Sequence, residues 1–238
     1  MEYIIATDMN QSSPTSPPQF MIGPDSEIKS CYAIITRVEP WRTGPPLHIH
    51  PGDQFYYCID GRLNLQIGDQ AFPISTDTLV QLPAGTPHCN YNNYDDYQWH
   101  LEIVAPAPPT FEQLVAPGEY KHVNNAEKLV RRWDKTPKVA AGEGTDRRWM
   151  TNRAQFGSEV AISVDELQKG AGEKQAKTFK TDHLFFTLKG DLTVDLDGQR
   201  HEVPPMSLVI APAEMAHAAY NTSNAPAKYL SIWINDPN

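Results

Sequence analysis

Two histidines separated by a single residue are the first feature of this sequence that can support chemistry. His48 and His50 stand in the segment LHIHP, at residues 47–51. On an extended chain, residues i and i+2 face the same side, so both imidazoles can point at one spot inside a barrel. Gln54 follows four residues later, and His88 comes directly after the turn-forming segment PAGTP. Imidazoles that converge in this way are typical ligands of divalent transition metals.

The chain repeats itself at an offset of 129 residues, and the two copies align without a gap. Residues 54–92 match residues 183–221. The matched pairs include Gly61 with Gly190, Pro83 with Pro212, His88 with His217, and Asn92 with Asn221. A match of this length that includes glycine, proline, histidine and asparagine indicates duplication of one domain.

Each copy has the two-residue hydrophobic period of β-strands. Apolar residues alternate with polar ones over residues 63–67 and again over 192–196. Gly68-Asp69 and Asp197-Gly198 are typical of tight hairpin turns. Residues 78–82 and 208–210 predict buried strands that end before a proline-containing turn. The pattern predicts an all-β protein built from two tandem domains.

The stretch between the copies is less regular. Residues 111–114 and 125–133 have some helical character, and Asn125 is a candidate N-cap for a short helix over residues 126–130. We place the domain boundary near residue 120. This predicts one domain over residues 1–120, a second over residues 121–238, and short helices between the barrels.

Both halves of the chain resemble the cupin family. The segment HIHPGDQFYYCIDG, at residues 48–61, resembles the first cupin motif, in which HxH is followed by Glu and then by Gly. The segment PAGTPHCNYN, at residues 83–92, resembles the second motif, PxGxxHxxxN. The resemblance covers roughly residues 40–105 and 170–235 and implies two double-stranded β-helix, or jelly-roll, barrels. Gly44 is displaced and Asp77 replaces an expected glycine, but neither departure affects the candidate ligands.

The resemblance places the metal ligands on His48, His50 and His88, with Gln54 at the position usually filled by Glu. It implies one divalent transition metal per chain, and Fe, Ni, Zn, Cu, Co and Mn all suit such a site. The amide oxygen of Gln54 can ligate as a neutral donor, or Gln54 can hydrogen-bond a water at the metal. Unlike Glu, it cannot act as a general base. Neutral ligands leave the metal its full charge, which favours an anionic oxygen ligand such as an enolate or phenolate.

The second copy lacks most of this ligand set. Lys177 stands at the position of His48 and Phe179 at that of His50, while His183 and His217 occupy the positions of Gln54 and His88. Two histidines rarely hold a catalytic metal tightly. We therefore expect the second barrel to be empty or structural, with a small-molecule pocket or a weak metal site as the alternative.

The first barrel looks most like the small metal-dependent cupin dioxygenases, including the quercetinase-like group. The resemblance implies a dioxygenase acting on an enolizable or phenolic small molecule. Two alternatives stay open: a non-redox metalloenzyme (isomerase, cyclase or lyase), and a metal-containing small-molecule binding protein without turnover. Analogy and exposed barrel edges lead us to expect a homodimer or a higher homo-oligomer.

The overall composition narrows the range of binding partners and of cellular compartments. The chain has 20 Lys and Arg against 29 Asp and Glu, a formal net charge of −9, which argues against nucleic acid or an anionic membrane as the main partner. The first eight residues do not form a signal peptide, and no apolar run is long enough to cross a bilayer. Cys31, Cys58 and Cys89 have no paired spacing. These features predict a cytoplasmic protein with reduced thiols.

Overall fold

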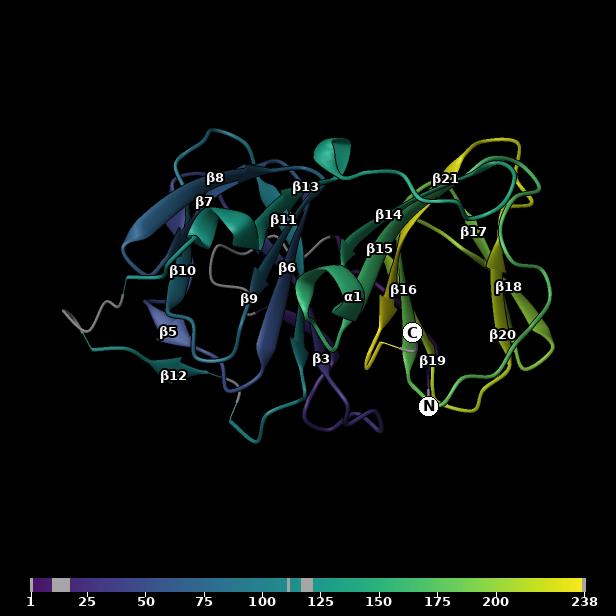
Figure 1. The fold of residues 1–238 in the computed structure, drawn as a ribbon, viewed down its shortest axis with the longest axis horizontal. Helices are drawn as coiled ribbons and strands as arrows, with labels where there is room; N and C mark the ends of the chain where they lie inside the picture. Colours follow the sequence, from purple (N-terminus) through teal and green to yellow (C-terminus); the bar gives the residue numbers. More distant parts are fainter. Residues whose placement is uncertain (1, 10–17, 111, 117–121, 237–238) are drawn as a thin grey trace. The chain divides into compact units, whose positions relative to one another are not determined.

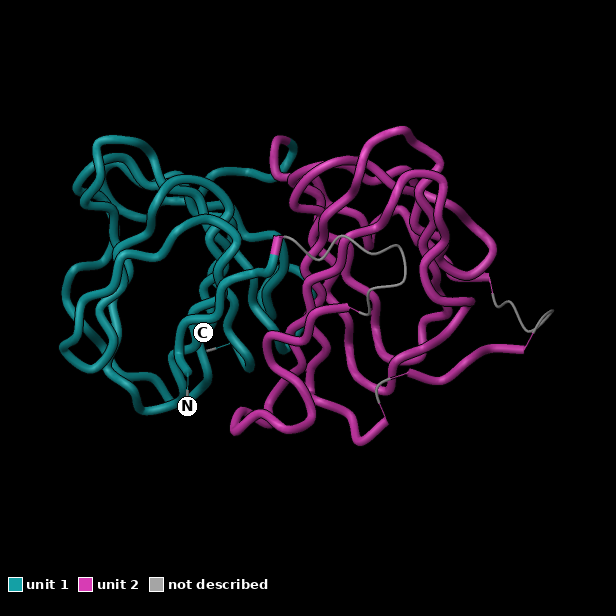
Figure 2. The backbone as a smooth tube through the Cα atoms, turned by 180° about the vertical axis from the view of Figure 1, so that it is seen from behind, with its two compact units in different colours: residues 1–8, 135–238 teal, residues 9–134 magenta. Residues whose placement is uncertain are grey.

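The computed structural model describes residues 2–9, 18–110, 112–116 and 122–236, and β-strands dominate it (Figure 1). The chain forms two compact units (Figure 2). One consists of Met9–Asp134 and the other of Met1–Asp8 together with Lys135–Asn238. Each unit contains two antiparallel sheets, which confirms the predicted all-β class with two tandem barrels.

The unit formed by residues 9–134, called the first barrel below, contains two six-stranded sheets. One sheet has the order β13-β9-β6-β11-β3-β2. Its strands are β13 (Val130–Arg132), β9 (Thr78–Leu82), β6 (Asp53–Asp60), β11 (Gln98–Ala105), β3 (Tyr32–Val38) and β2 (Gln19–Ile22). The other has the order β12-β5-β10-β7-β8, with β4 also paired to β10. Its strands are β12 (Gln113–Leu114), β5 (His48–Ile49), β10 (His88–Asn92), β7 (Arg62–Ile67), β8 (Gln70–Ser75) and β4 (Arg42–Thr43).

The other unit, called the second barrel, repeats this arrangement. Its larger sheet has the order β1-β19-β16-β21-β15-β14, and its smaller sheet has the order β18-β17-β20. The larger sheet contains β1 (Ile4–Ala6), β19 (Ser207–Ala211), β16 (His183–Lys189), β21 (Ala227–Trp233), β15 (Ala161–Leu167) and β14 (Thr145–Thr151). The smaller sheet contains β18 (Gln199–Val203), β17 (Leu192–Leu196) and β20 (His217–Tyr220). The repeat offset of 129 residues extends to strands outside the matched sequence, since β3 begins at Tyr32 and β15 at Ala161.

The predicted period-two strands supply the core of each barrel. Leu63, Leu65 and Ile67 are fully buried, and they pack with residues of β3, β6 and β9 from the facing sheet. Leu192, Val194 and Leu196 do the same in the second barrel. Removing this apolar surface from water is the main term that holds the two sheets together. The predicted turns at residues 68–69 and 197–198 connect the hairpins β7–β8 and β17–β18.

Each barrel has an edge strand that comes from the segment just before the other barrel in sequence. In the second barrel, Ile4 of β1 lies opposite Val209 of β19. In the first barrel, Val130 of β13 lies opposite Val80 of β9, the position that repeats as Val209. The units therefore differ from the sequence-based domains 1–120 and 121–238: residues 2–8 pair with the second barrel, and residues 122–134 belong to the first. Residue 120 itself lies outside the described residues.

The helical segment predicted between the copies is shorter than expected. Residues Ala126–Leu129 form the 3₁₀ turn η1, and Trp133–Lys135 form a second such turn, η2. Asn125 precedes η1 in the left-handed region at φ 55°, and its side chain makes no capping bond. Gln113–Leu114 form strand β12 instead of a helix, because they pair with β5, and residue 111 lies outside the described residues. A short helix, α1 (Arg153–Phe156), lies within the second barrel.

Two further features concern the whole described chain. Cys31, Cys58 and Cys89 are free thiols, as predicted from their spacing. Within the described residues, no helix has the length and apolar character needed to span a membrane.

A glycine present in both sequence repeats provides a test of the fold. Gly190 has φ 66°, and a Cβ there would lie 2.3 Å from the carbonyl oxygen of Pro226. Gly198 has a similar φ of 80°, but a Cβ there would meet nothing within 4 Å. Both alanine variants carry the left-handed strain of about 1–2 kcal/mol. Gly190→Ala should lower the free energy of unfolding by roughly 2 kcal/mol more than Gly198→Ala does, because the backbone at Pro226 must move aside. Urea denaturation of both variants checks this, and equal losses would contradict the close approach.

Candidate metal centre

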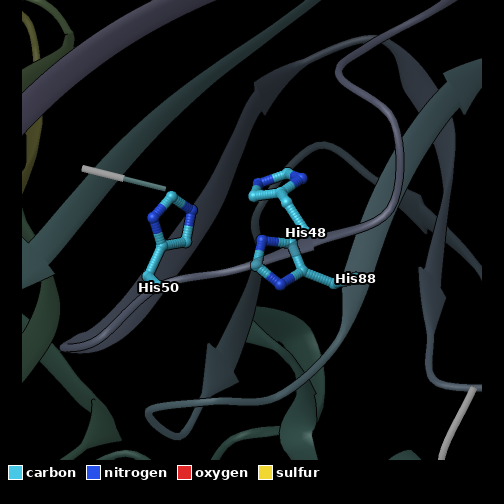
Figure 3. Close-up of side chains that lie close together, drawn as sticks. All are labelled: His48, His50 and His88. Atoms are coloured by element: carbon cyan, nitrogen blue, oxygen red, sulfur yellow. The ribbon is translucent and has the colours of Figure 1, made fainter. Parts of the chain in front are cut away.

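Three histidines come together inside the first barrel. The ligand nitrogens of His48, His50 and His88 all lie within 4.8 Å of one another, and all three side chains are buried. Figure 3 shows the three rings gathered around a common space. His48 lies on β5, His50 follows that strand directly, and His88 begins β10 opposite His48. One ion can contact all three nitrogens after small rotations of the rings.

Backbone carbonyls hold two of these rings in the orientation that a metal needs. The Nδ1 atom of His48 lies 2.8 Å from the carbonyl oxygen of Pro46, and that of His88 lies 2.8 Å from Thr86 O. A proton on each Nδ1 completes both bonds and leaves the Nε2 lone pairs for a ligand. The Nε2 of His88 is buried without a hydrogen-bond partner. Burial, reinforced by the neighbouring His48, lowers the pKa of His88 to about 3, so this ring is neutral and able to ligate.

Gln54 presents its oxygen as a fourth donor. It lies on β6, in the other sheet of the barrel, and its side chain is buried. The Nε2 group donates a hydrogen bond of 2.5 Å to the carboxylate of Glu102. Because a carboxylate accepts only from the NH₂ end of an amide, this contact identifies which terminal atom of Gln54 is the nitrogen and which is the oxygen. The remaining atom, Oε1, is buried without a partner. An orphaned buried acceptor is costly, and coordination to a metal would satisfy it.

Glu102 is a partly buried carboxylate next to this ligand set. Besides Gln54, it accepts a bond of 3.2 Å from the hydroxyl of Thr36 and lies 2.9 Å from the Nε2 of His100. Burial by itself raises the pKa of Glu102. The hydrogen bond and charge of His100 and the nearby ligand imidazoles outweigh burial and lower it to about 2. Glu102 is therefore an acceptor only, as its contact with Gln54 requires.

His100 holds this carboxylate in place. Its Nδ1 lies 2.7 Å from Gln98 Oε1 and 2.6 Å from the hydroxyl of Tyr56. The amide nitrogen of Gln98 donates to the carbonyl oxygen of Trp99, so the oxygen of Gln98 faces the ring. Both nitrogens of His100 and both oxygens of Glu102 therefore have hydrogen-bond partners.

An adjoining cavity of about 230 Å³ gives access to these donors. Residues that line it include His48, His88, Gln54 and Glu102. The other lining residues are both apolar and polar, and they include Ile34, Val38, Tyr56, Asn90, Trp99 and Glu112. The Glu112 carboxylate lies 4.0 Å from the Nε2 of His48 and is partly exposed. The site can therefore hold a small molecule beside a metal.

The second barrel uses its two remaining histidines differently. The Nδ1 of His217 lies 2.9 Å from Met215 O, so this nitrogen carries the proton and its Nε2 accepts. That Nε2 lies 2.9 Å from Nδ1 of His183, whose own Nε2 lies 2.7 Å from the Ser231 hydroxyl. Within the described part of the second barrel, no trio of metal-ligating groups comes together. The histidine nitrogens are instead engaged in hydrogen bonds.

Sequence motifs did not point to Glu102 or His100. Both belong to β11, downstream of the second motif and 48 and 46 residues after Gln54. The one local signal is that Gln98, His100 and Glu102 alternate with apolar or aromatic residues on a strand, which indicates polar side chains facing the interior. The four residues predicted as ligands do lie together in the structure. Their role as ligands stays a prediction.

The chain belongs to the cupin family. A family profile described as a cupin domain matches residues 34–103 and again residues 163–233, one stretch in each barrel. The predicted duplication and family are thus confirmed, and the chain is a bicupin.

Solved bicupin structures share this fold. Oxalate decarboxylase from Bacillus subtilis superimposes with a TM-score of 0.68 at 16% sequence identity, covering 88% of this chain and 70% of that chain. A mutant form of salicylate 1,2-dioxygenase from Pseudoaminobacter salicylatoxidans gives a TM-score of 0.71 at 14% identity, covering 91% and 75%. The decarboxylase contains Mn(II) centres, and the dioxygenase has been crystallised with gentisate. At these identities the likeness shows the fold alone.

A curated relative, the polyketide synthase CurC of Streptomyces cyaneus, is 30% identical over 66 residues. The match covers 26% of this chain and 42% of the relative, so this chain spans less than half of that protein.

Metal content tests the location of the site. The wild-type protein should hold one equivalent of a divalent transition metal, and His88→Ala should lose it because one of three imidazoles is removed. The matched change in the second barrel, His217→Ala, should leave the content unchanged. Elemental analysis after dialysis against a weak chelator measures all three proteins. Two equivalents in the wild type, or one retained in His88→Ala, would contradict the assignment.

Exchange of the Gln54–Glu102 pair tests the fourth ligand. Gln54→Glu alone brings two carboxylates into contact, and their repulsion or a shared proton offsets the gain of a charged ligand. The double variant Gln54→Glu/Glu102→Gln keeps the hydrogen bond with its direction reversed and places a carboxylate at the metal. It should bind Zn²⁺ at least about tenfold more tightly than the wild type, and more tightly than the single variant. Chelator competition measures each affinity. Equal affinities in all three proteins would show that Gln54 does not ligate.

Proposed function

We propose that this bicupin is a metal-dependent dioxygenase that acts on a small enolizable or phenolic compound. The observation that carries the proposal is the neutral donor set of His48, His50, His88 and the oriented oxygen of Gln54, which opens on a cavity. A divalent transition metal bound there supplies Lewis acidity and, if it is redox-active, a route to oxygen chemistry. Such a site lacks a negatively charged ligand, and an anionic oxygen of the substrate would supply one.

The protein's own residues select and orient the substrate. Ile34, Val38 and the rings of Tyr56 and Trp99 line the cavity with apolar surface that suits a flat, partly apolar molecule. Its volume of about 230 Å³ is below the range of roughly 300–1,000 Å³ typical of drug-sized ligands, so the substrate is small. Glu102 holds Gln54 in place and, with its lowered pKa, is a poor proton acceptor.

A second function, a non-redox metalloenzyme such as an isomerase or lyase, is favoured by Glu112. Reactions of this kind need a group that moves a proton, and neither Gln54 nor the tightly bound Glu102 serves this purpose. Glu112 lines the same cavity, is partly exposed and lies 4.0 Å from a candidate ligand. A dioxygenase and a decarboxylase both share the fold, so the scaffold accommodates either chemistry. A metal-containing binding protein without turnover is the third alternative, and the homodimer stays a prediction.

Oxygen uptake distinguishes these functions. The protein loaded separately with Fe, Mn, Ni, Co, Cu and Zn should be mixed with flavonols, catechols, hydroxybenzoates and β-diketones in an oxygen electrode. A dioxygenase consumes O₂ with one compound class and one redox-active metal, and His88→Ala abolishes the uptake. Product formation without O₂, lost in Glu112→Gln, would support the non-redox enzyme instead. Tight binding of a compound without any product would support the third alternative, a binding protein without turnover.

A further inference from the structure

The second barrel keeps a cavity in the place where the first barrel has its candidate metal centre. This cavity measures about 410 Å³ and is larger than that of the first barrel. Its walls include Lys177 and Phe179, which stand at the positions of two histidines in the first barrel. The cavity is partly open to solvent, so a small molecule can reach its walls.

The occupant is not a metal held by the remaining histidines. His183 and His217 form a chain of hydrogen bonds that runs from Ser231 through both rings to Met215 O. One face of His183 is also covered by Trp233, whose ring lies 3.4 Å away at an angle of 16°. No nitrogen of His183 is left for coordination, since both are engaged.

Strand β14 brings a fixed cation to this cavity. Arg147 donates from Nε at 3.0 Å and from Nη2 at 2.5 Å to the buried carboxylate of Asp165. That carboxylate also accepts from Ser163 at 2.9 Å and from Tyr229 at 3.1 Å, so its position is fixed from several sides. The bonds to Asp165 do not use Nη1. Arg147 lines the cavity and also contacts Tyr229, so its guanidinium, held in place by Asp165, can donate there to a ligand.

Two more groups on the cavity wall can donate to the same ligand. Thr145 lies two residues before Arg147 on β14, and its buried hydroxyl has no hydrogen-bond partner. Lys177 lines the cavity and pairs with Glu173, and both side chains are about half exposed. An exposed pair of this kind contributes little, so an incoming anion can replace Glu173, which also lines the cavity, as the partner of Lys177. These donors suit a ligand that accepts several hydrogen bonds and carries negative charge.

The wall also carries aromatic side chains. Phe179 and Trp233 pack edge to face with ring centroids 4.6 Å apart, and both line the cavity with Phe185 and Tyr229. Such a wall favours a planar apolar body over a flexible polar one. We propose that the second barrel binds a small aromatic carboxylate. Its ring packs against Phe179 and Trp233, and its carboxylate meets Arg147, Lys177 and Thr145.

Calorimetric titration of the full-length protein with benzoate tests the proposal. Benzoate can also reach a metal in the first barrel, so the titration is run on the metal-loaded protein and on His88→Ala. Binding at the second barrel persists in His88→Ala. Benzamide, which has the same shape without the charge, and acetate, which lacks the ring, should each bind about tenfold more weakly or worse.

Variants of the wall locate the binding. Lys177→Met and Phe179→Ala should each weaken benzoate binding about tenfold. Lys174→Met, an exposed lysine on the same loop that does not line the cavity, is the matched control and should have no effect. Arg147→Lys keeps a cation beside Asp165 but removes the planar fork, and it should also weaken binding. Arg147 is not removed outright, because Asp165 would be left buried without its cation.

Three results would overturn the proposal. The first is no benzoate binding to His88→Ala, which would assign all binding to the first barrel. The second is benzamide binding as tightly as benzoate, which would remove the role of the cations. The third is equal binding to Lys177→Met, Phe179→Ala and the Lys174→Met control, which would place the ligand elsewhere.

Discussion

The hydrogen bond from Gln54 to Glu102 is the contact on which the candidate metal centre depends. It joins two adjacent strands, β6 and β11, of the larger sheet of the first barrel, and it decides which atom of the amide faces the histidines. Without a carboxylate at residue 102, either end of the amide could point inward, and a nitrogen there would repel a metal. His100 in turn holds the carboxylate from the same strand. A buried polar network is stabilising where its members are paired, and the Oε1 of Gln54 is the atom of this network left for a metal.

Neutrality is the chemical consequence of this network. Many metal sites use a ligand carboxylate, which lowers the charge of the ion and offers a proton acceptor at the reacting centre. In this barrel the carboxylate belongs to Glu102, which binds the amide of the candidate ligand Gln54 and contacts His100. An ion held by imidazoles and an amide would keep its charge for an anionic substrate. Proton transfer, where the reaction needs it, then falls to another group of the cavity such as Glu112.

The two barrels show how one scaffold supports two interiors. The structurally equivalent positions 36, 100 and 102 hold Thr, His and Glu in the first barrel, and positions 165, 229 and 231 hold Asp, Tyr and Ser in the second. The buried acid has moved from β11 to β15, the strand equivalent to β3, and there it fixes Arg147. The backbone pairing is unchanged. The candidate metal centre and the proposed anion-binding cavity therefore differ by a few inward-facing residues on the same fold.

The sequence by itself determined the elements that rest on short-range rules. Period-two alternation located the strands around Leu63 and Leu192, the turn residues located two hairpins, and the spacing of His48 and His50 put both rings on one side of the chain. The ungapped repeat was enough to show the duplication. Only the tertiary structure decided which acid contacts Gln54, which strand covers each barrel edge, and that Arg147 meets Asp165. Those outcomes depend on the pairing of strands that lie far apart in sequence, and local propensity carries no information about that pairing.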